Sequence, residues 1–233
     1  METTVVERVI QSAPYPVEEL RPIHSALRVA SDYLAMRIAS ANRPDSPEDL
    51  QMRRSGASVQ QIVTSFILEH YEATRDTEET IKRNWIYDRL AVFWQGYREL
   101  VVEPLKNHGI DINRLSSKVG MEQVFELKNG VKGMVATAVL AQSRGWEVDF
   151  PTIEEDVRQG IDLYLSRGSR RVPTQIKCKL GKKFGVVREG ISRVVNVYIP
   201  ADPYFFMDAE LGIPHRKHAE DFDNWLTDHS RGI

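Results

Sequence analysis

The stretch Glu154–Lys179, EEDVRQGIDLYLSRGSRRVPTQIKCK, decides how the second half of this 233-residue chain is expected to fold. Two runs within it, GIDLYL (160–165) and TQIKCK (174–179), are short, rich in β-forming residues and bounded by Gly, Pro or Ser. Such runs are typical of β-strands. The sequence therefore predicts two strands that are close neighbours along the chain.

Polar side chains occupy selected positions in both runs. Asp162 lies between Ile161 and Leu163, and strand alternation places it on the opposite face from these two residues. A charge inside an apolar strand is costly unless it is paired or bound to a metal. Gln175 and Lys177 are two residues apart and share one face of the second strand. If the two strands pair as a hairpin, Asp162, Gln175 and Lys177 converge.

The flanking sequence predicts helices on both sides of a small sheet. A helical period runs from residue 122 to 143, with a possible break at Asn129-Gly130, and Gly145 is placed to end it. Further strands are expected over 146–150 and 194–199, and a terminal helix over 219–229. A helix, four strands and a helix indicate an α/β (α+β) domain over residues 119–233.

Residues 1–118 are expected to form a separate helical domain, for DNA engagement, dimerisation or partner binding. Apolar residues recur every three or four positions over 17–41. A second helix is expected to start near Ser58, a good N-cap residue, and a third at the acid-rich segment 76–80.

Composition excludes several classes of protein. A single Cys excludes a disulfide framework within the chain and any metal site built from several cysteines. Cys178 alternates with Lys177 and is expected to face the core. No apolar run reaches the roughly 20 residues of a membrane-spanning helix, and the first residues, METTVVERVI, lack the apolar core of a signal peptide. The expectation is a soluble, cytoplasmic protein with no membrane partner.

The net charge of −2 is the sum of two opposed blocks. Residues 147–162 carry six acids and one base, whereas residues 163–193 carry nine bases and one acid. The basic block would attract a polyanion. Acids that hold a divalent cation, beside bases that hold phosphates, are what cleavage of a phosphodiester requires.

The order of these residues resembles the PD-(D/E)XK nuclease superfamily. An Asp is followed about a dozen residues later by an acid or Gln, any residue and a Lys, on adjacent strands after a helix. The form Asp162…Gln175-Ile176-Lys177 is similar to the variant of Mrr-type restriction endonucleases, and the lead-in SRGWEV (143–148) resembles the helix end and first strand of that core. The resemblance covers about residues 120–200. It implies a restriction-endonuclease-like core, with a central mixed sheet flanked by helices.

The resemblance also implies a role for each residue. Asp162 would bind a divalent metal, Mg²⁺ or Mn²⁺, and Gln175 would replace the usual second acidic ligand. The carbonyl of Ile176 would add a ligand, and Asp156 would supply the carboxylate that Gln175 lacks. Lys177 would orient or help deprotonate the attacking water and stabilise the charge of the transition state.

Further residues complete the expected site. In the helix that often supplies an extra Glu in this superfamily, Met134 stands at that position, and Glu126 would have to substitute from an earlier turn. Lys179 is expected on the same face as Lys177, near a phosphate. The residues expected to contact nucleic acid are Lys179, Lys182, Lys183, Arg170 and Arg171.

The function expected from the sequence is metal-dependent endonucleolytic hydrolysis of DNA, in restriction, repair, recombination or a mobile element. A homodimer would supply the two active sites that a double-strand cutter needs. Two alternatives remain open. One is a catalytically inactive nucleic-acid-binding protein on a nuclease fold, and the other is a protein-interaction or structural protein.

Overall fold

The computed structural model describes Ser25, Arg28 and residues 46–74, 121–179, 184–190, 193–200 and 214–232. At 48–49, 52, 70–74, 121–128 and 179 it describes the backbone alone. The helices expected over 17–41 and from residue 76 lie outside these ranges, except that Ser25 and Arg28 are helical. The chain divides into two compact units, Met1–Ile67 with Trp85–Leu127 and Leu68–Asn84 with Lys128–Ile233. The domain boundary after residue 118 stays a prediction.

Helix α3 (Pro47–Thr74) is longer than the sequence suggested. The prediction that a helix starts near Ser58 was wrong, because α3 already begins at Pro47. A proline is well tolerated in the first turn of a helix, where its missing N–H has no partner to lose. The backbone N–H of Leu50 donates to the carbonyl of Ser46 and closes that first turn.

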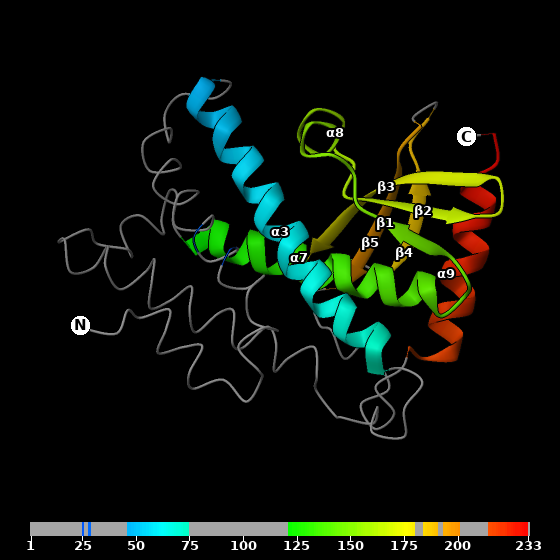
Figure 1. The fold of residues 1–233 in the computed structure, drawn as a ribbon. Helices are drawn as coiled ribbons and strands as arrows, with labels where there is room; N and C mark the ends of the chain where they lie inside the picture. The colour runs from blue at the N-terminus through cyan, green and yellow to red at the C-terminus, as the bar shows by residue number, and fades with distance from the viewer. Residues whose placement is uncertain are drawn as a thin grey trace. The chain divides into compact units, whose positions relative to one another are not determined.

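The second unit contains a five-stranded mixed sheet, as the α/β fold class predicts (Figure 1). Its strands are β1 (Glu147–Asp149), β2 (Leu163–Arg167), β3 (Arg170–Lys179), β4 (Gly185–Arg188) and β5 (Val195–Pro200). The order in the sheet is β1-β2-β3-β5-β4, and only β3 and β5 pair in parallel. This unit also contains α8 (Ile153–Gln159), α9 (Arg216–His229) and, from residue 128 on, helix α7 (Met121–Gln142). The long β3 therefore lies at the centre of the sheet.

One face of the sheet is apolar and packs against helix α7. The strand registers place a set of buried side chains on this face: Leu163, Leu165, Val172, Thr174, Val195, Val197 and Ile199. Figure 1 shows α7 crossing the strands. The contact is close at Gly133, where an added Cβ would lie 2.8 Å from Cγ2 of Ile176 and 3.2 Å from Cβ of Cys178. Cys178 faces this side of the sheet, as alternation predicted.

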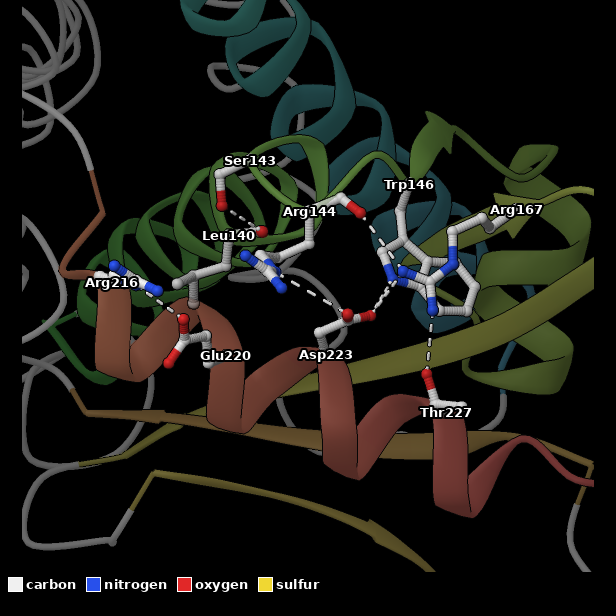
Figure 2. Close-up of polar contacts among 9 residues, drawn as sticks. All are labelled: Leu140, Ser143, Arg144, Trp146, Arg167, Arg216, Glu220, Asp223 and Thr227. Atoms are coloured by element: carbon white, nitrogen blue, oxygen red, sulfur yellow. Dashed lines mark hydrogen bonds and ion pairs between the residues drawn. The ribbon is translucent and has the colours of Figure 1, made fainter.

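Helix α9 is fastened to the sheet through Asp223 (Figure 2). The carboxylate of Asp223 accepts from the indole N–H of Trp146 at 2.8 Å and pairs with Arg167 at 2.7 Å. The guanidinium of Arg167 also lies 4.3 Å from the ring centre of Trp146 and donates to Thr227. The terminal helix that the sequence predicted is thus confirmed, and it buries Ala219, Phe222 and Leu226.

Several details differ from the sequence prediction. Helix α7 continues through Asn129-Gly130 without the break that the prediction left open. Strand β3 begins at Arg170 and includes Pro173, which marked the expected boundary. Proline lacks the N–H that a central strand needs, but pairing between β3 and β5 begins only at Thr174. Helix α8 and strand β4 were not predicted. The described ranges contain no helix that is long and apolar enough to span a membrane.

Candidate functional site

The site begins with the short helix α8, which has well-defined ends. Thr152 and Glu155 form a capping box, in which the Thr152 hydroxyl accepts from the Glu155 N–H and the Glu155 carboxylate accepts from the Thr152 N–H. Gly160 ends the helix in the left-handed conformation, with φ of 65°, and its N–H donates to the carbonyl of Asp156. This turn carries the chain from Asp156 directly to Asp162.

Asp162 immediately precedes β2, so the prediction that it lies inside the strand was wrong. Its N–H donates to the carbonyl of Thr174 at 2.8 Å, and its Oδ2 accepts from the N–H of Ile176 at 2.5 Å. The Asp162 carboxylate therefore acts as the hydrogen-bond acceptor for β3 just before the regular strand pairing of β2 begins. The flanking residues Ile161 and Leu163 are buried, in agreement with the predicted alternation.

The ionisation of Asp162 is controlled by its surroundings. The pKa of the Asp162 carboxyl is raised to about 7, mainly by burial and to a smaller extent by the negative charge of Asp156. The N–H of Ile176 and the charge of Lys177 act on this pKa in the opposite direction. Asp156 and Lys177 thus both lie within electrostatic reach of Asp162.

Gln175 lies on the same side of the hairpin as Asp162. Leu163 pairs with Thr174 in this antiparallel hairpin. Asp162, the residue before Leu163, therefore lies across from Gln175, the residue after Thr174. The carboxamide of Gln175 packs against the turn at Gly160, where an added Cβ would lie 2.7 Å from Nε2. The start of β2 and the adjacent part of β3 therefore bring together four polar side chains, those of Asp156, Asp162, Gln175 and Lys177.

The remaining predicted site residues stay predictions. The contact that Ile176 makes with Asp162 comes from its N–H, so its expected carbonyl ligand stays a prediction. Met134 is 1 % exposed and faces the core, so that position of α7 offers no donor. The side chain of Glu126 lies outside what the structure describes, as do that of Lys179 and the whole of Lys182 and Lys183.

The basic residues of the hairpin have different surroundings. Arg171 shares the face of Asp162, and its guanidinium lies 3.8 Å from the ring centre of Tyr164. The Tyr164 hydroxyl donates to Glu155 at 2.8 Å, which fixes the ring. Arg170 is exposed at the hairpin end, opposite Arg167. Arg167 is engaged by Asp223 on the other face of the hairpin, so these two described bases, Arg167 and Arg171, do not share one surface.

Two polar residues beside the site were missed by sequence reasoning. Asn196 lies opposite Gln175 in the β3–β5 register, and Tyr198 lies opposite Lys177, with the Lys177 ammonium 5.8 Å from the Tyr198 ring centre. Alternation in the run VVNVYI places Asn196 and Tyr198 on one face. The sequence gives no sign, however, that this strand is the parallel neighbour of the strand with Gln175 and Lys177.

Within the described ranges, no group of three or more His, Cys, Asp or Glu side chains is arranged to hold a metal ion. The donors gathered here are instead the carboxylates of Asp156 and Asp162 and the amide of Gln175. Comparison of the chain with protein-family models, curated proteins and solved structures returned no match.

Proposed function

We propose that this chain is a metal-dependent endonuclease that hydrolyses DNA phosphodiester bonds on a restriction-endonuclease-like core, preceded by a helical domain. The observation that carries the proposal is the hairpin geometry, in which Asp162 accepts from the N–H of Ile176, and the residues on either side of Ile176, Gln175 and Lys177, share the face of Asp162. Carboxylates that hold a cation, beside a fixed ammonium group, are the equipment that phosphodiester hydrolysis uses.

The donor set fits Mg²⁺ or Mn²⁺. Carboxylate and amide oxygens are the hard ligands that these ions prefer. The charge of Asp156 raises the pKa of Asp162, which reflects a repulsion that a divalent cation would relieve. Asp162, Asp156 and Gln175 would hold the ion. When bound, it would lower the pKa of a water molecule and offset charge on the phosphate.

The remaining residues would position the reactants. Hydrolysis joins a water oxygen to phosphorus and breaks one P–O ester bond. Lys177 would donate to the attacking water or to a non-bridging phosphate oxygen, where negative charge develops. Arg171, held against Tyr164, and the exposed Arg170 would contact flanking phosphates. A homodimer would supply the second site that cleavage of both strands requires.

Cleavage of supercoiled plasmid with Mg²⁺ or Mn²⁺ tests the proposal. We expect Lys177→Ala to lower the nicking rate by about 100-fold or more, the usual scale for a group that stabilises a transition-state charge. Lys217→Ala, which removes an exposed lysine on α9, should leave the rate unchanged. Equal rates for the wild type and Lys177→Ala, in a preparation free of host nuclease, would rule out the catalytic role.

A second candidate function is nucleic-acid binding without catalysis. Gln175 is neutral, so the site has one formal negative charge fewer than the acidic form of the motif. The lack of a three-membered acid or histidine group in the described ranges also favours this candidate. It predicts DNA retention that weakens with salt and no cleavage at any metal concentration. Filter binding in parallel with the plasmid assay distinguishes the two functions.

A further inference from the structure

Gly160 meets two separate requirements at the turn between α8 and β2. Its φ of 65° lies in the left-handed region, which glycine adopts without strain. It also leaves space, because a Cβ added there would lie 2.7 Å from Nε2 and 3.5 Å from Cδ of Gln175. Two other glycines, Gly168 at 63° and Gly190 at 60°, share the conformation but have nothing within 4 Å of an added Cβ. Of these three left-handed glycines, Gly160 is therefore the one with a close contact.

The contact orients the carboxamide of Gln175. Its nitrogen and Cδ lie within 4 Å of the position where a Cβ would stand at Gly160, whereas its oxygen Oε1 does not. The nitrogen is therefore the end that faces the turn. A carboxamide binds a cation only through its oxygen, and in this orientation the oxygen is the end directed away from the turn at Gly160.

We propose that Gly160 is a positioning residue for the cation site, because the absence of its side chain seats the Gln175 carboxamide with its oxygen available to the ion. This inference rests on the proposed metal-dependent function. It assigns to Gly160 a role beyond helix termination, although Gly160 itself supplies no ligand.

A side chain at position 160 should act on the site more than on the fold. The carboxamide is the far end of a flexible side chain, so it can turn away from a new methyl group at small cost to packing. The backbone strain of an alanine at this φ should equal that at Gly168, whose φ differs by 2°. Gly168→Ala is therefore a matched control for everything except the contact with Gln175.

The experiment is a calorimetric titration of the full-length chain with MnCl₂, accompanied by thermal unfolding. We expect Gly160→Ala to weaken Mn²⁺ binding by about tenfold or more, on the scale of losses seen when a residue that orients a metal ligand is changed. Gly168→Ala should bind Mn²⁺ within about twofold of the wild type, since a distant surface turn does not contact the ligands. Both variants should lose the same amount of thermal stability.

A double-mutant cycle identifies the route of the effect. Gln175→Ala alone should weaken Mn²⁺ binding, and Gly160→Ala should cause no further loss in that background. If the wild type binds Mn²⁺ and Gly160→Ala binds it equally well, the positioning role is wrong while the metal site stands. The positioning role is also wrong if Gly160→Ala weakens Mn²⁺ binding equally in the wild-type and the Gln175→Ala backgrounds. If the wild type binds no Mn²⁺, the metal site itself is wrong and this role falls with it.

Discussion

The carboxylate of Asp162 occupies a place where its negative charge opposes folding. Burial raises its pKa from an ordinary value of 3.8 to about 7, so the folded chain holds this proton more tightly than the unfolded chain does. The stability that the protonated group contributes is fully present below about pH 4. It is lost progressively as the pH rises through 7, where the folded state ionises. A buried charged group that costs stability is typical of functional sites.

Asp162→Asn should therefore stabilise the fold at neutral and alkaline pH. An asparagine oxygen can still accept from the N–H of Ile176 but carries no charge. We expect the free energy of unfolding to exceed that of the wild type by up to about 4 kcal/mol at pH 8, with the difference closing toward pH 4. Urea unfolding without divalent cations, over pH 4–8, measures it. Asp149→Asn, at an exposed position of β1, is the control. A difference that does not change with pH contradicts the account.

At the scale of single residues, alternation was enough to predict which side chains share a face. It placed Asp162 opposite Ile161 and Leu163, and it placed Gln175 with Lys177. It could not show that β2 begins only after Asp162, because the start of this strand depends on the direction in which the chain leaves the turn at Gly160. The pKa of Asp162 likewise depends on burial, which no local pattern contains.

At the scale of elements, the fit of α7 on β3 depends on one glycine. A Cβ at Gly133 would lie 2.8 Å from Cγ2 of Ile176, closer than carbon atoms pack. Alanine is the better helix former by about 1 kcal/mol, so Gly133→Ala would stabilise a helix that packed against nothing. We expect a net loss of about 1–3 kcal/mol in the free energy of unfolding, because the helix must shift away from the sheet.

Chemical denaturation of Gly133→Ala, Ile176→Ala and the double variant tests this explanation. Removing Cγ2 of Ile176 makes room for the new methyl group, so Gly133→Ala should cost less in the Ile176→Ala background than in the wild type. Equal costs in the two backgrounds would place the strain elsewhere.

Long elements with a clear period were predictable from sequence, and so was the three-residue strand β1, which lies within the run expected over 146–150; helix α8 and strand β4 were not. The apolar face of α7 and the alternating run of β5 extend far enough to identify themselves. Helix α8 has only seven residues and buries none of them, so it lacks an apolar face and its acids suggest a loop. Its capping box was present in the sequence at Thr152 and Glu155, and this signal could have located it. Strand β4 has four residues, too few for a period.

At the scale of the whole molecule, the charge blocks of the sequence are rearranged by folding. The sequence shows the excess of bases over 163–193 but not where their charges go. Arg171 faces the candidate site, whereas Arg167 is neutralised on the opposite side of the hairpin by Asp223, a residue from the last helix. Contacts between such distant segments have no local signature. The sequence therefore predicts that residues 163–193 carry a positive charge. It does not predict which of their basic side chains lie on the same face of the fold.

Asp223 should be a sensitive charged residue of the described fold, because it joins α9 to the turn before β1 and to the end of β2. Its carboxylate accepts from Trp146 and pairs with Arg167, and Arg144 lies 3.8 Å away (Figure 2). Trp146 is 2 % exposed, so Asp223→Ala would leave its indole N–H buried without an acceptor. We expect a loss of about 2–4 kcal/mol in the free energy of unfolding, measured with urea.

Glu220 gives the matched comparison on the same helix. Its ion pair with Arg216 has a similar distance, 2.8 Å against 2.7 Å for Asp223 and Arg167, but the side chains of Glu220 and Arg216 are 41 % and 90 % exposed. Water and salt screen such a pair, so Glu220→Ala should leave the unfolding midpoint unchanged within error. Equal losses for Asp223→Ala and Glu220→Ala would mean that α9 responds to any lost charge. A loss confined to Asp223→Ala would show that its contacts with Trp146 and Arg167 hold α9 against the sheet.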